Sequence, residues 1–320
     1  MTALAKLIEQ FKAQDRQALA KAITIVESKA DQDREAQAAL LRGIPQPQKT
    51  SIRIAISGPP GVGKSTLINL LGQKLLDRNL TMAILSIDPS SDETKGSILG
   101  DKTRMKDLLA HPEIYIRPSP SKGSLGGVTL STADVMYLVE AFGFDVVVIE
   151  TVGVGQSETI ARFLADHFVL MVQPGSGDQL QAMKMGIIEK ADFILINKAD
   201  DEQLPLAEQT RKSLMTLELR RANLAPYVSC ISALHGIGVD DFLEALLSRH
   251  QELQGSGELL YLRTKYRASL TEYVFEQTLL ERLRNFPHVA KRLRDTSIES
   301  GPLLPAINAV VDAICHQFSL

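Results

Sequence analysis

The sequence predicts an α/β fold built on a doubly wound, mostly parallel sheet, with a helical arm before it and helices after it. Short apolar, β-branched runs alternate with helical patterns through residues 50–254, as in repeated βαβ units. Helical spacing alone fills residues 1–45 and 258–320. We therefore expect three regions with these bounds: an N-terminal helical arm, a sheet domain and a C-terminal helical region.

Composition limits the class of protein. The 320 residues are 44% hydrophobic and 23% charged, which suffices for a sizeable core and excludes a mostly disordered chain. The formal net charge of −3 gives no overall basic field, so neither nucleic acid nor a membrane surface is expected as a partner. Charges recur through the first residues, and Cys230 and Cys315 cannot form a disulfide framework. We therefore expect a cytoplasmic protein.

The first region carries apolar residues at helical spacing, first at Leu4 and Phe11 and again at Leu19 and Ile23. One or two amphipathic helices are expected there. Residues 43–50 contain two prolines and no apolar period, which is typical of a linker.

The second region contains the expected strands. Several are unbroken apolar runs, as in parallel sheets that are buried on both faces. Ligands of such sheets bind at the carboxyl ends of the strands, so the chemistry is expected just after each run. The expected strands are Ile52–Ser57, Met82–Ile87, Ile114–Ile116, Val146–Ile149, Phe168–Val172, Phe193–Ile196 and Tyr227–Ile231.

The strongest motif is a glycine-rich segment between the first expected strand and a helix. It has the spacing G-x-x-x-x-G-K-S of a P-loop, which makes the expected fold that of a P-loop NTPase. Its backbone N–H groups can bind phosphate oxygens, while Lys64 neutralises the β- and γ-phosphates and the Ser65 hydroxyl ligates Mg²⁺. The nucleotide-binding residues expected here are Gly58, Pro59, Pro60, Gly61, Val62, Gly63, Lys64, Ser65 and Thr66.

A second motif predicts the base. Asp200 follows an apolar run within the segment NKAD, where its carboxylate can accept hydrogen bonds from N1–H and the exocyclic amine of guanine. Adenine lacks that donor pair. The segment SAL follows the next strand, where GTPases present backbone N–H groups to the guanine carbonyl, although Leu234 replaces a commoner Lys. The residues expected at the base are Asn197, Lys198, Asp200, Ser232, Ala233 and Leu234.

A third strand end is acidic. Glu150 closes a run of the Walker B form, so it is expected at Mg²⁺ directly or through water, and Gly153 is expected to donate its N–H to the γ-phosphate. Val154 stands where Ras-like proteins place a water-orienting Gln, and Gln156 comes two residues later. Intrinsic hydrolysis is therefore expected to be slow.

Long polar loops also leave the strand ends. Residues 88–105 are typical of a nucleotide-sensing switch, in which Asp88 and Asp101 can approach Mg²⁺. Residues 119–127 and 173–178 form two further loops. A plain connection is the alternative reading for each.

The strings DPSS, SILGDKTRM, RPSPSKGSLGGV, ETVGVGQSE and NKAD occur in this order around the P-loop. Together they resemble the MeaB/ArgK branch of the methylmalonyl-CoA mutase-associated GTPases, over most of residues 1–320. The resemblance implies a magnesium-dependent GTPase that dimerises through its C-terminal helices. Such a protein is a chaperone of an adenosylcobalamin-dependent acyl-CoA mutase: it gates cofactor delivery and protects or reactivates the mutase. Cobalamin is expected on the partner, and an adenosyltransferase is a second expected partner.

The resemblance also implies residue roles. Catalysis would depend on Lys64, Asp101, Glu150 and Gly153, and the Mg²⁺ set would be Ser65, Asp88, Asp101 and Glu150. The switch residues would be Arg104, Gln156, Asp178 and Lys184. The sequence departs from the family pattern at two positions in these switches. Lys95 precedes Gly96 where a second Gly is common, and Gln179 stands where Glu is common.

Three alternatives remain open from the residues. A nickel or cobalt metallochaperone GTPase shares the P-loop and the guanine motif, but the six histidines are scattered and no Cys-x-Cys-Cys or Cys-Pro-His string occurs. A module that binds nucleotide without hydrolysing it is the second alternative, and Val154 in the water-orienting position is compatible with it. A small-molecule kinase needs an acceptor pocket that no motif marks.

Overall fold

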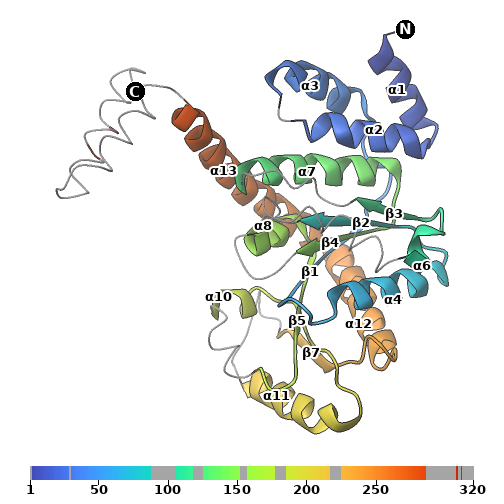
Figure 1. Cartoon of the computed structure of the whole chain (residues 1–320), viewed down its shortest axis with the longest axis vertical. Coiled ribbons are helices and arrows are strands. Elements are labelled where there is room, and N and C mark those ends of the chain that lie inside the picture. Colours follow the sequence, from blue (N-terminus) through green and yellow to red (C-terminus); the bar gives the residue numbers. More distant parts are fainter. Residues whose placement is uncertain are drawn as a thin grey trace. The chain divides into compact units, whose positions relative to one another are not determined.

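The computed structural model describes residues 2–28, 30–87, 106–117, 125–151, 157–176, 185–216 and 225–285, together with positions 308 and 311 (Figure 1). The chain forms two compact units, Met1–Leu270 and Thr271–Leu320. Among the described helices, none combines the length and the apolar composition that a bilayer crossing requires.

A seven-stranded sheet forms the centre of the first unit. Its spatial order is β3-β2-β4-β1-β5-β6-β7, and every neighbouring pair is parallel. The chain runs from β1 to β2 and β3 on one side, returns to β4 beside β1, and continues through β5, β6 and β7 on the other side. The sheet is therefore doubly wound, with its reversal at β1. This confirms the predicted fold class. The strands are β1 (Ile52–Ser57), β2 (Met82–Ile87), β3 (Ile114–Arg117), β4 (Val146–Thr151), β5 (His167–Val172), β6 (Phe193–Ile196) and β7 (Tyr227–Cys230).

The sheet is covered on both faces, which explains its unbroken apolar strands. Every residue of β4 and of β5 is buried. On one face, Ile54 and Ile56 of β1 pack with apolar side chains of α4 and α12. On the other face, α7 contacts β2 and β4, and α8 contacts β1, β4 and β5 (Figure 1). The helices that follow the strands are α4 (Lys64–Leu76), α6 (Lys106–Leu109), α7 (Leu125–Phe142), α8 (Ser157–Leu164), α10 (Met185–Ile188), α11 (Leu204–Thr216), α12 (Val239–Gly255) and α13 (Glu258–Asn285).

The N-terminal arm consists of α1 (Ala3–Lys12), α2 (Arg16–Val26), the short 3₁₀ turn η1 (Asp31–Asp33) and α3 (Arg34–Gly43). The arm was predicted as one or two helices and contains three. Side-chain oxygens cap the first two, with Thr2 accepting from the Ala5 N–H and Asp15 accepting from the Gln17 N–H.

The arm packs against α7 and against the edge strand β3. Phe11 of α1 meets Phe142 of α7 edge to face, with ring centroids 5.4 Å apart. Arg16 donates to the carbonyls of Pro112 and Ile114, at the start of β3. These contacts make the arm part of the first unit.

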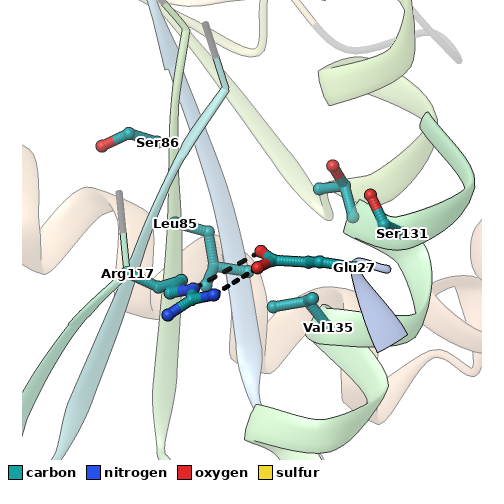
Figure 2. Close-up of a pocket in the computed structure, with 7 residues that line it drawn as sticks. Glu27, Leu85, Ser86, Arg117, Ser131 and Val135 are labelled. Atoms are coloured by element: carbon teal, nitrogen blue, oxygen red, sulfur yellow. Dashed lines mark hydrogen bonds and ion pairs between the residues drawn. The ribbon is translucent and has the colours of Figure 1, made fainter. Parts of the chain in front are cut away.

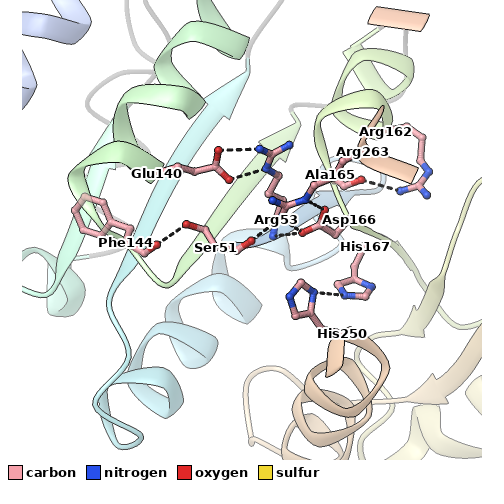
Figure 3. A network of polar contacts seen from close by, with 10 residues as sticks. All are labelled: Ser51, Arg53, Glu140, Phe144, Arg162, Ala165, Asp166, His167, His250 and Arg263. Atoms are coloured by element: carbon pink, nitrogen blue, oxygen red, sulfur yellow. Dashed lines mark hydrogen bonds and ion pairs between the residues drawn. The ribbon is translucent and has the colours of Figure 1, made fainter. Parts of the chain in front are cut away.

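A buried ion pair closes the amino end of the sheet (Figure 3). Arg263, in the second turn of α13, donates to both carboxylate oxygens of Asp166, at 2.8 and 2.6 Å, and also to the Ser51 carbonyl at 2.6 Å. Asp166 also accepts from the Arg53 backbone N–H at 3.0 Å. Burial by itself raises the pKa of Asp166, but hydrogen bonding and the charge of Arg263 bring that pKa below its ordinary value. The amino ends of β1 and β5 are thereby joined to α13.

Beside this ion pair lie two buried histidines (Figure 3). His167 of β5 and His250 of α12 share one hydrogen bond, with 3.3 Å between Nε2 and Nδ1. The His167 Nδ1 has no hydrogen-bond partner among the residues that the structure describes. Burial lowers the pKa of His167 to about 3 and also lowers the pKa of His250. Both rings are therefore neutral in the folded protein.

We predict that this pair makes the protein less stable as the pH falls below about 6.5. The folded-state pKa of His167 is below its unfolded value, so unfolding takes up a proton at acidic pH, and full stability is retained only above the unfolded pKa. The expected loss is about 1.4 kcal/mol for His167 between pH 7.5 and 5.5. Urea unfolding at several pH values measures it.

His111 supplies the control because its side chain is exposed. His167→Gln should flatten the dependence of unfolding free energy on pH over this range, and His111→Gln should not change it. An unchanged slope in His167→Gln would contradict the assignment.

Candidate functional site

The P-loop joins β1 to α4 at the point of strand reversal. Gly61 and Gly63 have φ angles of +74° and +103°, in the left-handed region that favours glycine. Gly63 is the N-cap residue of α4, which begins at Lys64. The loop and the first turn of α4 therefore direct backbone N–H groups toward one position, as anion sites at helix N-termini require.

Lys64 is buried inside this loop. Its Nζ donates to the carbonyls of Gly58 at 2.7 Å and Pro59 at 3.2 Å. Burial lowers the pKa of Lys64, and the charges of Glu150 and Glu158 partly offset that effect. The loop thus holds a cation among carbonyl and carboxylate groups, ready to bind phosphate.

The next residue of α4 contacts the acidic strand end. The Ser65 hydroxyl donates to Oε1 of Glu150 at 2.9 Å, and Glu150 lies in β4, in register with Ile56 of β1. The strand extends to Thr151, beyond its predicted end, so Glu150 lies within the sheet and not in the following loop. A hydroxyl and a carboxylate are hard oxygen donors of the kind that Mg²⁺ takes, so these two residues fit the ion.

One side chain connects the P-loop to the loops after β6 and β7. The Asn197 amide nitrogen donates to the Val62 carbonyl at 2.7 Å, and its amide oxygen accepts from the Ala233 N–H at 2.9 Å. A Cβ added at Gly63 would lie 2.3 Å from the same amide nitrogen. The close approach of Asn197 therefore requires glycine at position 63.

Asp200 lies beside this connection. Its Oδ2 accepts from the Ser232 hydroxyl at 2.6 Å and lies 3.7 Å from Nε2 of His235. The side chain of Asp200 remains 24% exposed, and that of the adjacent Leu234 is exposed. Asp200 is thus an oriented carboxylate that solvent can reach.

Three site residues were missed in the sequence. Glu158 of α8 accepts from the Ser57 hydroxyl at 3.2 Å. Gln173, directly after β5, donates to the Gly61 carbonyl at 3.3 Å. His235 follows the segment SAL. Each stands in or beside a string already noted in the sequence, but only the contacts across the fold distinguish it from its neighbours.

The predicted residues divide into three groups. The structure brings together the P-loop, Glu150, Asn197, Asp200 and Ser232–Leu234. Lys198 follows Asn197 with an exposed side chain and a φ of +64°. The others lie outside the described residues: Asp88, Asp101, Arg104, Gly153, Gln156, Asp178 and Lys184. The departures Lys95 and Gln179 lie there as well.

A small polar pocket occupies another part of the carboxyl edge (Figure 2). At its floor, Arg117 at the end of β3 forms an ion pair with Glu27, which follows α2. Burial opposes the charge of Arg117, but hydrogen bonding to Glu27 raises its pKa overall. None of the predicted nucleotide-binding residues contributes to this pocket, which is lined by Glu27, Leu85, Ser86, Arg117, Ser131, Thr132 and Val135.

Comparison with known proteins gives a consistent result. Residues 19–288 match the family model described as "Methylmalonyl Co-A mutase-associated GTPase MeaB". A probable GTPase of Mycobacterium tuberculosis is 42% identical over 302 residues, covering 92% of this chain and 90% of the relative. GTPase ArgK of Escherichia coli is 37% identical over 284 residues, covering 88% and 86%.

One further relative and one solved structure extend this result. The mitochondrial methylmalonic aciduria type A homolog of Mus musculus is 37% identical over 306 residues, covering 91% of this chain and 74% of the relative. A crystal structure described as an LAO/AO transport system kinase superposes with a TM-score of 0.76 at 28% identity, covering 98% and 99% of the two chains. The P-loop, its connection through Asn197 to the loops after β6 and β7, and these matches all agree. The chain belongs to the MeaB family of methylmalonyl-CoA mutase-associated GTPases, and it is a GTPase.

Proposed function

We propose that this GTPase binds GTP with Mg²⁺ at the loop between β1 and α4 and serves an adenosylcobalamin-dependent acyl-CoA mutase as a chaperone. The observation that carries the nucleotide site is the double hydrogen bond of Asn197, which fixes the phosphate loop and the base loop relative to each other. A nucleoside triphosphate has its phosphates and its base at two such places.

The residues then have separate roles. The N–H groups of the loop bind phosphate oxygens, and Lys64 balances their charge after leaving the carbonyls of its own loop. Ser65 and Glu150 would hold Mg²⁺, whose charge would help to neutralise the phosphates. Asp200 accepts from the guanine edge, with Ser232 keeping its carboxylate oriented. Because Val154 stands in the water-orienting position, turnover without a partner is slow.

The partner proposal is supported by the family description, which names methylmalonyl-CoA mutase. In the chaperone role, GTP binding and hydrolysis gate cofactor delivery and protect or reactivate the mutase. We propose that the working form is a homodimer. This is supported by apolar side chains that α13 leaves exposed, namely Leu260, Tyr261, Phe275, Leu279 and Leu280.

A metallochaperone role has less support. Within the described part of the chain, no group of three or more His, Cys, Asp or Glu side chains could hold a metal ion. Burial and the nearby Glu208 raise the pKa of the Cys230 thiol to about 11, so it stays protonated at neutral pH and is a poor metal ligand.

The first prediction of the proposed function concerns Gly63, whose lack of a side chain lets Asn197 approach the phosphate loop. Gly63→Ala should place a methyl group against the Asn197 amide and also strain the backbone, whereas Gly61→Ala should only strain it, because nothing lies within 4 Å of its added Cβ. We expect a loss of about 1 kcal/mol for Gly61→Ala and about 3 kcal/mol for Gly63→Ala, from urea unfolding without nucleotide. Equal losses would show that the Asn197 contact is dispensable.

The second prediction concerns the base. Asp200→Asn replaces an acceptor by a group with donors, so GTP affinity should fall about 100-fold while xanthosine triphosphate, which presents a carbonyl in place of the amine, gains. Competition binding measures both. The control Asp201→Asn removes the same charge from an exposed neighbour and should leave the GTP preference intact. If Asp200→Asn kept that preference, Asp200 would not read the base.

The third prediction tests the chaperone role. GTP hydrolysis by the purified protein with Mg²⁺ should be slow and should rise severalfold when a cobalamin-dependent acyl-CoA mutase is added, while ATP is not hydrolysed. Phosphate release is measured alongside a search for phosphorylated small molecules. No response to any such mutase would overturn the client assignment, and transfer of phosphate to an acceptor would favour the kinase alternative.

A further inference from the structure

Both ends of the phosphate loop are held by a buried carboxylate through a serine hydroxyl. At the far end, Ser65 donates to Glu150 at 2.9 Å, and this acid belongs to the predicted Mg²⁺ set. At the near end, Ser57, the last residue of β1, donates to Glu158 at 3.2 Å. Ser57 is fully buried and Glu158 is 9% exposed. The second acid closes the string ETVGVGQSE but has no role so far in the nucleotide site.

The two carboxylates share one neighbour. Within the described part of the chain, the charges that act on Lys64 are those of Glu150 and Glu158, and both favour its protonated form. The Lys64 ammonium meanwhile donates to the carbonyls of Gly58 and Pro59. A phosphate that bonds to Lys64 therefore competes with two carbonyls and with the attraction of two carboxylates for this ammonium group.

Glu158 also occupies a position that can transmit movement. It is the second residue of α8, at the positive end of the helix dipole, where a carboxylate is favoured. Residues 152–156, the predicted switch that contains Gly153, connect β4 to this helix. A shift of α8 would change the distance between Glu158 and the loop, whereas Glu150 is fixed within the sheet.

We propose that Glu158 is a positioning residue of the GTPase reaction, which competes with the nucleotide phosphates for Lys64 and so speeds the release of GDP. The inference rests on the proposed placement of the nucleotide at the phosphate loop. In this role Glu158 contacts neither the reacting atoms nor the metal. It acts through Lys64 and through Ser57.

The test compares GDP release in matched variants. Glu158→Gln keeps the shape and an acceptor for Ser57 but removes the charge, while Ser57→Ala keeps the charge and removes the hydrogen bond. The probe is methylanthraniloyl-GDP with Mg²⁺, chased by excess GDP, and its fluorescence decay gives the dissociation rate. We expect Glu158→Gln to slow release about threefold to tenfold and Ser57→Ala to change it by less than about twofold.

Steady-state kinetics supply a second measurement, the split between KM and kcat, which would not change in this way if Glu158 had only a structural role. Because the chemical step is slow, Glu158→Gln should lower KM for GTP about as much as it slows GDP release and should leave kcat within about twofold. Glu158→Asp, which retains the charge, should restore both values. Glu113→Gln removes an exposed acid before the edge strand β3 and should change neither. Melting temperatures of all variants show that each is folded.

Two outcomes separate this inference from the site on which it rests. If Lys64→Ala binds methylanthraniloyl-GDP as tightly as the unmodified protein, the placement of the nucleotide is wrong. If Lys64→Ala loses binding but Glu158→Gln releases GDP at the normal rate or faster, only the role of Glu158 is overturned.

Discussion

The double hydrogen bond of Asn197 is the contact on which the geometry of the site depends. Its donor and its acceptor are both used, one on the Val62 carbonyl and one on the Ala233 N–H. Loops after three different strands are thereby held at fixed separation in a buried position. This amide therefore supplies rigidity that a ligand spanning the phosphate loop and the base loop needs. The constraint also explains a sequence requirement, because Gly63 must lack a side chain for the amide to approach.

The amino and carboxyl ends of the strands form two edges of the sheet with different functions. At the amino edge, Asp166 forms an ion pair with Arg263 and accepts from the Arg53 backbone N–H, which holds the start of α13 against β1 and β5. At the phosphate loop, Glu150 and Glu158 accept from serine hydroxyls, and Lys64 donates to carbonyls that a ligand can replace. A parallel sheet separates these tasks because all its strands end at the same edge. Stability and nucleotide chemistry therefore depend on different residues of the same strands.

Much of the fold could be predicted because its signals are local. Strands such as Phe193–Ile196 are unbroken apolar runs, and the P-loop needs only the spacing of its own residues. The parts that were missed depend on distant partners. Glu158 gains its importance from Ser57, 101 residues away, and Glu27 from Arg117, 90 residues away. His167 extends β5 beyond its predicted start, since a histidine gave no apolar signal although its ring is buried against Phe193.

The order of the strands also has a consequence for how the chain folds as it is synthesised. β1 is complete at Ser57, but its two neighbours in the sheet begin only at Val146 and His167. At typical translation rates this leaves the central strand without either partner for roughly 5–20 s. During that interval β1 is an exposed apolar edge, the kind of segment that pairs with other chains. The order of the strands thus exposes the centre of the sheet to intermolecular pairing before any GTP can bind.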